Sequence, residues 1–167
     1  MRLMTWNLWW RFGEWESRQP AILQTLETAN PDVVCLQEVW SSEDGTDQAH
    51  ELAQALGMNY VRTPERWWNG HSFGNAILSR DPISTSNAIQ LPPTDGPGTR
   101  WALSAIIDRN EVRIPVICTH LDYRFDQSQR RQEQVRALFD LVQSEHNAEA
   151  HPVILAGDFN ATPNSAE

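Results

Sequence analysis

Residues 152–165, PVILAGDFNATPNS, place an acid and an amide directly after an apolar run. The run 153–156 predicts a short buried strand, and Gly157 lets the chain turn at its end. Asp158 and Asn160 then follow at the carboxyl end of that strand, where α/β sheets place their chemistry. Asp158 can bind a hard cation or accept a proton from water, and the amide of Asn160 can hold that water or a phosphate oxygen. For an isolated Gly-Asp-x-Asn, the structural alternative is a turn that caps its own backbone.

Other predicted strands also begin or end with polar side chains. Taken alone, each has an ordinary explanation, such as a solvated strand end or a hydrogen-bonded structural histidine. Together with Asp158 and Asn160 they make a set of carboxylates, amides and one imidazole, which suits Mg²⁺ or Mn²⁺ acting on phosphate; Zn²⁺ normally requires more His or Cys. These further residues are Asn7, Glu38, Asn75 and His120.

A nucleophilic thiol is the rival chemistry within the sequence. Cys118 and His120 are two residues apart on a predicted strand, so they share a face. Cys118 has apolar neighbours, however, and nothing else in the chain resembles a thiol hydrolase. Cys35 also lies in an apolar run. Both cysteines are therefore interpreted as core residues of a reduced protein and not as a disulfide.

The elements that must position these residues alternate at first between strand and helix, which is the order of a βαβ unit. The first helix carries Pro20 in its first predicted turn. From residue 58 onward the apolar spacing shortens to that of strands. The loops at 64–73 and 91–100 contain Pro, Gly or Trp and are long enough for binding. The predicted strands are 2–7, 32–38, 58–63, 75–80, 83–90, 101–108, 112–119 and 153–156, and the predicted helices are 17–28, 47–56 and 128–144.

The composition excludes some function classes. The 167 residues carry a formal charge of −9, and all thirteen basic residues are arginine. Without lysine, Schiff-base chemistry is excluded, whereas the planar arginine fork suits phosphate. An acidic chain has little general affinity for nucleic acid, although a bound metal can supply positive charge locally. No run is long enough to span a membrane and no signal peptide precedes the first strand, so we expect a cytoplasmic location.

Five segments, in this order, resemble the endonuclease/exonuclease/phosphatase superfamily, the metal-dependent phosphohydrolases related to DNase I. The resemblance runs from residue 2 to the end of the chain and implies an α/β fold that is part of a four-layer sandwich. The segments are TWN (5–7), PDVVCLQE (31–38), FGNAILSR (73–80), THLD (119–122) followed by Arg131 and Gln134, and GDFNATP (157–163).

The resemblance also implies roles for individual residues. Glu38 is the expected principal metal ligand, with Asn7 and Asp158 beside the Mg²⁺ or Mn²⁺. Asp158 would orient or deprotonate the attacking water, Asn160 would hold a phosphate oxygen, and His120 would contact the phosphate or assist the leaving group. Two further residues have less direct roles: Asn75 is a candidate phosphate-side amide, and Arg131 is expected to tie the third helix to the site.

The resemblance further implies a second half, after the GDFN strand, that supplies another aspartate and an Asp-His pair. Residues 1–167 contain no match to it, because His146 and His151 precede the GDFN loop. We therefore expect one incomplete domain at 1–167 with its C-terminal half missing, through truncation or because a second chain completes it. Such a piece should show little or no turnover and should self-associate through uncovered apolar surface.

The leading interpretation is an Mg²⁺-dependent phosphoesterase that uses in-line attack by water. Its acidic charge favours a small or lipid-like phosphate ester over duplex nucleic acid, without stable membrane insertion. Trp9, Trp10, Trp15, Trp40, Trp67 and Trp68 are candidates for stacking on a base or sugar, or for contact with lipid, although about half of the eight tryptophans are expected in the core. The alternative is a non-catalytic fold fragment or binding module that retains only the scaffold.

Overall fold

The computed structural model describes residues 1–65, 67–93, 99–149 and 151–167. Residues 66 and 94–98, which belong to the two loops predicted for binding, therefore lie outside the described residues. The elements, in chain order, are β1 (Leu3–Asn7), α1 (Trp15–Ala29), β2 (Val33–Val39), α2 (Gln48–Leu56), β3 (Asn59–Arg62), β4 (Gly74–Ser79), β5 (Ile83–Leu91), β6 (Arg100–Arg109), β7 (Val112–His120), α3 (Ser128–Glu149) and β8 (Ile154–Asp158).

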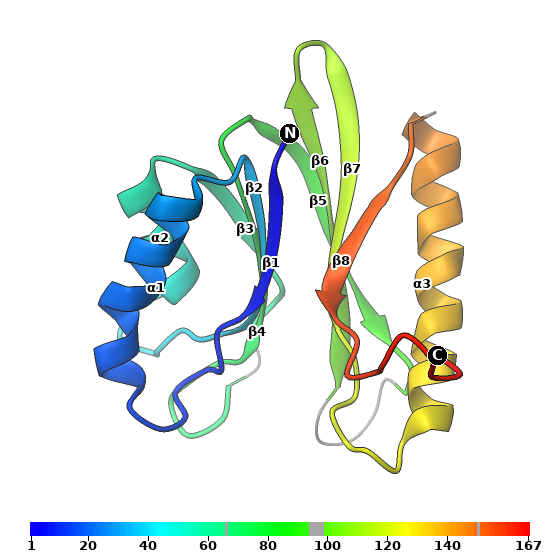
Figure 1. The fold of residues 1–167 in the computed structure, drawn as a ribbon, viewed down its shortest axis with the longest axis horizontal. Helices are drawn as coiled ribbons and strands as arrows, with labels where there is room; N and C mark the ends of the chain where they lie inside the picture. Colours follow the sequence, from blue (N-terminus) through cyan, green and yellow to red (C-terminus); the bar gives the residue numbers. More distant parts are fainter. Residues whose placement is uncertain (66, 94–98, 150) are drawn as a thin grey trace.

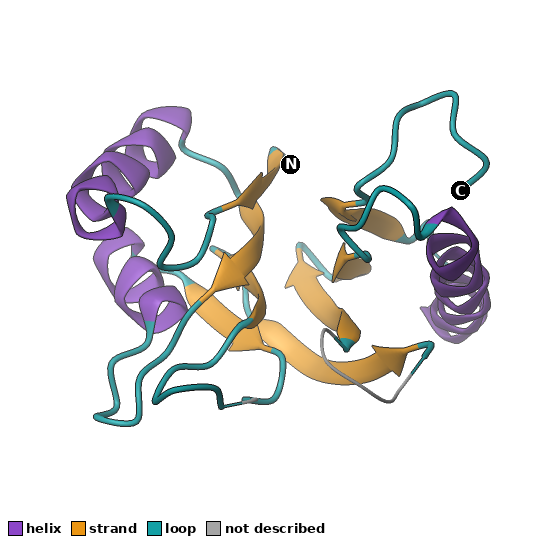
Figure 2. Ribbon diagram, turned by 90° about the horizontal axis from the view of Figure 1, so that it is seen from below, coloured by secondary structure: helices purple, strands orange, loops and turns teal. Residues whose placement is uncertain are grey.

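The elements form four layers. One sheet has the strand order β1-β2-β4-β3 and the other β5-β6-β7-β8. The sheets face each other, α1 and α2 cover the outer face of the first, and α3 covers the outer face of the second (Figure 1). Seen from below, the layers follow one another in the order helices, sheet, sheet, helix (Figure 2). The prediction of an α/β fold that is part of a four-layer sandwich is thus confirmed.

Each interface between layers has its own apolar cluster, and β2 contributes to two of them. Val34 and Leu36 pack toward α1 and α2, whereas Val33 and Cys35 pack against the second sheet. This alternation buries both faces of β2, which explains its continuous apolar run. Cys35 and Cys118 are fully buried, unpaired by a disulfide and part of the cluster between the sheets, as predicted.

Two helix boundaries differ from the prediction. α1 begins at Trp15, so Pro20 lies inside the helix and not in its first turn. The earlier start is stabilised because the Trp15 ring packs edge-on against Trp40, with centroids 5.2 Å apart. α3 continues to Glu149, beyond the predicted end at residue 144. Its last turns are held by Glu145, whose Oε1 accepts a hydrogen bond from Ser104 Oγ at 2.6 Å.

Fewer tryptophans are buried than expected. Trp40 is buried, four others are half-buried, and Trp9, Trp67 and Trp68 are exposed.

Among the described helices, none has the length and apolar character needed to cross a bilayer.

Candidate active site

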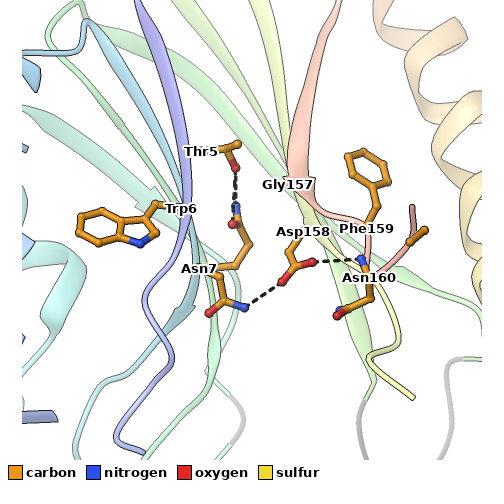
Figure 3. Close-up of a pocket in the computed structure, with 9 residues that line it drawn as sticks. Thr5, Trp6, Asn7, Gly157, Asp158, Phe159 and Asn160 are labelled. Atoms are coloured by element: carbon orange, nitrogen blue, oxygen red, sulfur yellow. Dashed lines mark hydrogen bonds between the residues drawn. The ribbon is translucent and has the colours of Figure 1, made fainter. Parts of the chain in front are cut away.

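The site lies where strands of the two sheets end side by side. Asn7 ends β1, and Asp158 ends β8 opposite His120 of β7. The side chains of Asn7 and Asp158 point toward each other across the gap between the sheets (Figure 3). They share a pocket of about 420 Å³. Its lining consists of Thr5, Trp6, Asn7, Gln37, Gly157, Asp158, Phe159, Asn160 and Ala161.

Gly157 is needed for this arrangement because β8 approaches β7 closely. A Cβ atom at this position would collide with the backbone carbonyl of Thr119. The glycine therefore lets β8 pair in register with β7, so that Asp158 lies opposite His120.

Asn7 bridges the two candidate carboxylates. Its Nδ2 donates hydrogen bonds to Glu38 Oε1 and to Asp158 Oδ2, both at 3.0 Å. Its Oδ1 accepts a hydrogen bond from the backbone N–H of Trp9 at 2.8 Å. The Asn7 amide is thus fixed by three contacts and holds two acidic groups from different sheets near each other.

Glu38 reaches the site because β2 is irregular at this residue. The register of β2 with β4 shifts between Gln37 and Val39, and Glu38 has a left-handed φ of 56°. Such a bulge turns consecutive side chains to one face. Gln37 Nε2 accordingly contacts Cys118 Sγ at 3.3 Å, and Glu38 Oε1 lies 3.9 Å from His120 Nε2.

The environment of Glu38 suits a cation. Its Oε2 is buried and has no hydrogen-bond partner within the described part of the chain. Burial raises the pKa of Glu38, and the nearby Asp158 adds to this, while the hydrogen bond from Asn7 and the charge of Arg100 oppose it. A buried carboxylate oxygen without a donor loses hydration that a bound cation can replace.

His120 is 2% exposed and lies between Arg100 and the carboxylates. Arg100 Nη1 is 3.2 Å from His120 Nδ1, and His120 Nε2 is 3.8 Å from Asp158 Oδ2. Burial, followed by the charge of Arg100, lowers the pKa of His120 to about 3. The imidazole is therefore neutral at physiological pH.

The Gly-Asp-x-Asn segment forms a local turn and also directs a carboxylate oxygen into the pocket. Asp158 Oδ1 accepts a hydrogen bond from the backbone N–H of Asn160 at 3.0 Å, which is the local turn. Asp158 Oδ2 faces Asn7 and the pocket (Figure 3). Asn160 has a φ of 49° and donates from Nδ2 to the carbonyl of Leu121 at 3.2 Å, so one amide hydrogen remains for a ligand.

The side-chain amide of Asn75 binds to the second sheet. Asn75 is 4% exposed, and its Nδ2 donates to the carbonyl of Trp101 at 3.1 Å. It lines a smaller cavity together with Arg100 and His120. Arg131 has the expected linking position, because its Nη1 donates to the carbonyls of Asp122 and Arg124 in the loop after β7.

Two further charged residues near His120, Arg100 and Asp122, were not predicted as site residues from the sequence. Arg100 is 7% exposed, and its guanidinium lies 5.6 Å from the ring centroid of Tyr123. Burial opposes ionisation of Asp122, but hydrogen bonds from Arg124 outweigh it and hold the pKa of Asp122 below its usual value. Asp122 belongs to the THLD segment, which was a usable signal, whereas Arg100 follows a loop without any motif.

Comparison with known proteins decides the family. A sequence model of the endonuclease/exonuclease/phosphatase family matches residues 4–167. The chain belongs to this family.

Two proteins similar to this chain are longer than it is. Protein YbhP of Escherichia coli (strain K12) is 30% identical over 153 residues, which cover 84% of this chain and 58% of YbhP. The solved catalytic domain of human Nocturnin, with a bound sulfate anion, is 25% identical with a TM-score of 0.81. That match covers 99% of this chain and 65% of the Nocturnin chain. The chain thus spans less than two thirds of each of these two relatives.

The donor set of this family member fits a divalent cation. Glu38 offers an unpartnered buried oxygen, Asp158 a carboxylate, and Asn7 an amide beside both. The carboxylate oxygens are donors of the kind that Mg²⁺ and Mn²⁺ prefer, and Asn7 can add only the lone pair of Oδ1 that does not accept the Trp9 N–H. Over the described ranges, no group of three or more His, Cys, Asp or Glu side chains is arranged as a metal site. The two carboxylates and the amide are therefore the candidate ligands.

Proposed function

We propose that residues 1–167 are the N-terminal part of one metal-dependent phosphoesterase domain, which hydrolyses a phosphate ester with water. The observation that carries the proposal is the pair of acids, Glu38 and Asp158, joined by Asn7 next to the buried His120. In a member of the endonuclease/exonuclease/phosphatase family, this grouping of a buried neutral imidazole with two carboxylates supports hydrolysis over a purely structural role.

The side chains have distinct proposed roles. Glu38, Asp158 and Asn7 would hold Mg²⁺ or Mn²⁺, which when bound neutralises charge on the phosphate and the leaving group. Asp158 orients the attacking water and accepts its proton. Asn160 uses its free amide hydrogen to hold a phosphate oxygen.

His120 is proposed to act as a neutral hydrogen-bond donor to the phosphate or to the leaving-group oxygen. Asn75 contacts the phosphate side from the smaller cavity that it shares with His120. Neither role requires a covalent enzyme intermediate.

The charge of the chain bears on the substrate. A formal charge of −9 without any lysine favours a small or lipid-like phosphate ester over duplex nucleic acid.

We also propose that the chain self-associates through exposed apolar side chains such as Phe125, which is 98% exposed. Size-exclusion chromatography over a range of protein concentrations tests this: an elution volume that does not change would contradict it.

The test combines metal binding with hydrolysis. The Asp-His pair implied by the family resemblance is not among these 167 residues, so we expect slow turnover and take Mg²⁺ binding as the primary measurement. Calorimetric titration with Mg²⁺ and Mn²⁺ is compared with hydrolysis of bis-p-nitrophenyl phosphate, with and without EDTA. Glu38→Gln and Asp158→Asn should lose metal binding, whereas the exposed control Glu51→Gln should retain it. A folded chain that binds no metal would contradict the proposal and favour a non-catalytic binding module.

A further inference from the structure

A series of ring contacts connects His120 with the molecular surface. Phe73 lies against His120 with centroids 6.2 Å apart, and Trp10 lies 6.3 Å from Phe73. Beyond Trp10, the series continues to Trp68 at 6.0 Å and to Phe12 at 5.3 Å. Trp9 completes it at 6.1 Å from Phe12. We call Phe73, Trp10, Trp68, Phe12 and Trp9 the aromatic wall.

The outer part of the aromatic wall is unusually exposed. Trp68 is 66% exposed, Trp9 55% and Phe12 46%. Single exposed apolar residues are common in folded proteins, but contiguous exposed aromatic rings mark a binding surface more often than chance placement. Because the inner end of the wall contacts His120, this surface is continuous with the candidate active site.

The aromatic wall is fastened to the candidate metal ligands. Asn7 Oδ1 accepts the Trp9 N–H at 2.8 Å, and the Glu38 carbonyl accepts the Trp10 N–H at 3.0 Å. Both tryptophans have left-handed backbones, with φ of 62° and 41°, which is costly for residues with large side chains. The residues that would hold the metal therefore also set the turn that presents these two rings.

Arg18 stabilises this unfavourable turn. Its guanidinium donates to the carbonyls of Leu8, Trp9, Trp10 and Phe12, and it lies 5.0 Å from the Trp9 ring centroid. Trp10 is held as well, because its Nε1 donates to the Ser72 carbonyl at 2.7 Å. Rings fixed in this way can stack on a ligand with little further loss of conformational entropy.

We propose that the aromatic wall is a substrate subsite that stacks a planar aromatic ring carried by the phosphate ester. This inference rests on the proposed function, since it assigns the scissile phosphate to the site beside His120. A planar ring is favoured because the wall is held at a fixed position relative to Asn7 and Glu38, as a ring on the same molecule as the phosphate requires. Lipid insertion is disfavoured because the net charge of −9 repels anionic headgroups.

Two ligands that differ only by a planar ring test the subsite by binding alone. Adenosine 5′-monophosphate and ribose 5-phosphate carry the same sugar phosphate, and only the first carries a base. We expect the full chain, titrated calorimetrically with Mg²⁺ present, to bind adenosine 5′-monophosphate at least about 10-fold more tightly. Trp68→Ala should remove most of this difference, and Trp68→Phe should retain part of it. Because Trp68 is largely exposed, these variants should fold normally.

Phe139→Ala is the matched control, since Phe139 on α3 is 65% exposed and lies outside the aromatic wall. It should leave the ring preference unchanged. Equal binding of the two ligands, including binding of neither, would overturn the subsite. If, in addition, the chain sediments with phosphatidylcholine vesicles in a Trp68-dependent way, the aromatic wall would be assigned to lipid binding. Ring-dependent binding by a folded chain that binds neither Mg²⁺ nor Mn²⁺ would contradict the proposed function and still support the subsite.

Discussion

Arg100 donates a hydrogen bond from Nη1 to Nδ1 of His120 at 3.2 Å. A guanidinium has no acceptor and stays charged, so Nδ1 must accept and the imidazole proton must be on Nε2. The Nε2–H consequently faces Glu38 Oε1 and Asp158 Oδ2, at 3.9 and 3.8 Å. Arg100 thereby makes His120 a neutral donor, and leaves it no free lone pair on the side that faces the site.

The tautomer of His120 should depend on the hydrogen bond from Arg100. Arg100→Met removes this donor, so both tautomers should become populated, whereas Arg100→Lys retains a cationic donor. The ¹⁵N shifts of the His120 ring, measured by NMR in the labelled chain, distinguish the tautomers. The control Arg136→Met changes an exposed arginine of α3 and should leave the shifts as they are. An unchanged Nε2–H tautomer in Arg100→Met would contradict this role for Arg100.

Acid should destabilise the folded chain through His120. Its pKa is about 3 in the folded state and near 6.5 when unfolded, so below pH 6.5 the unfolded state binds the additional proton. The free energy of unfolding should fall as the pH is lowered, by up to roughly 1.4 kcal/mol per pH unit from this residue. Urea unfolding at pH 7 and pH 5 measures the slope, and His120→Gln should flatten it. Glu38 changes the free energy of unfolding in the opposite direction as the pH falls, because its pKa is raised in the folded state. This contribution is present in both chains and does not affect the comparison. Equal slopes in the two chains would refute the assignment.

Replacing Glu38 should separate stability from function. Burial raises the pKa of Glu38, so its ionised form destabilises the metal-free fold at neutral pH. Glu38→Gln should raise the melting temperature in EDTA and should abolish Mg²⁺ binding, because it removes a carboxylate ligand. Thermal unfolding and calorimetric titration with Mg²⁺ are measured on the same preparation, with Glu51→Gln as the surface control. A lower melting temperature in EDTA would mean that the Asn7 hydrogen bond and the Arg100 charge stabilise ionised Glu38 by more than burial destabilises it.

An extra carboxylate at residue 7 should make the fold depend on metal. Asn7 donates to two carboxylates, so Asn7→Asp replaces two hydrogen bonds with repulsion between acids. The variant should unfold at a lower temperature in EDTA and recover with added Mg²⁺ by more than the unsubstituted chain does. Thermal shift as a function of Mg²⁺ concentration gives the comparison. The prediction fails if Mg²⁺ shifts both chains equally.

Sequence reasoning succeeded where a residue's position follows from its own strand. The apolar runs before Asn7, Glu38, His120 and Asp158 locate each of them at or near a strand end, and the structure places all four together. Arg100 was not found because its contact with His120 depends on how β6 pairs with β7, with Ala102 opposite Thr119. Such a register between non-adjacent residues leaves no periodic signal in the chain.

Local patterns also failed to show what the bulge in β2 does. Strict alternation would direct Gln37 and Glu38 to opposite faces, yet both approach the second sheet. Asn75 illustrates the converse. Its place at a strand start was predicted correctly, but the hydrogen bond from its Nδ2 to the Trp101 carbonyl was not.

The Asn7 bridge joins groups that belong to different sheets, and among the described residues no backbone ladder pairs one sheet with the other, so side-chain contacts set how far apart the sheets lie. The distances between the side chains of the candidate active site therefore depend on the spacing of the two sheets. Cys35 and Cys118 fill the same intersheet layer a few residues away, and a bulky adduct on either thiol would wedge the sheets apart. Asp158 would then move away from Glu38 although neither residue is altered, so the separation of the two candidate metal ligands depends on the thickness of the core between the sheets.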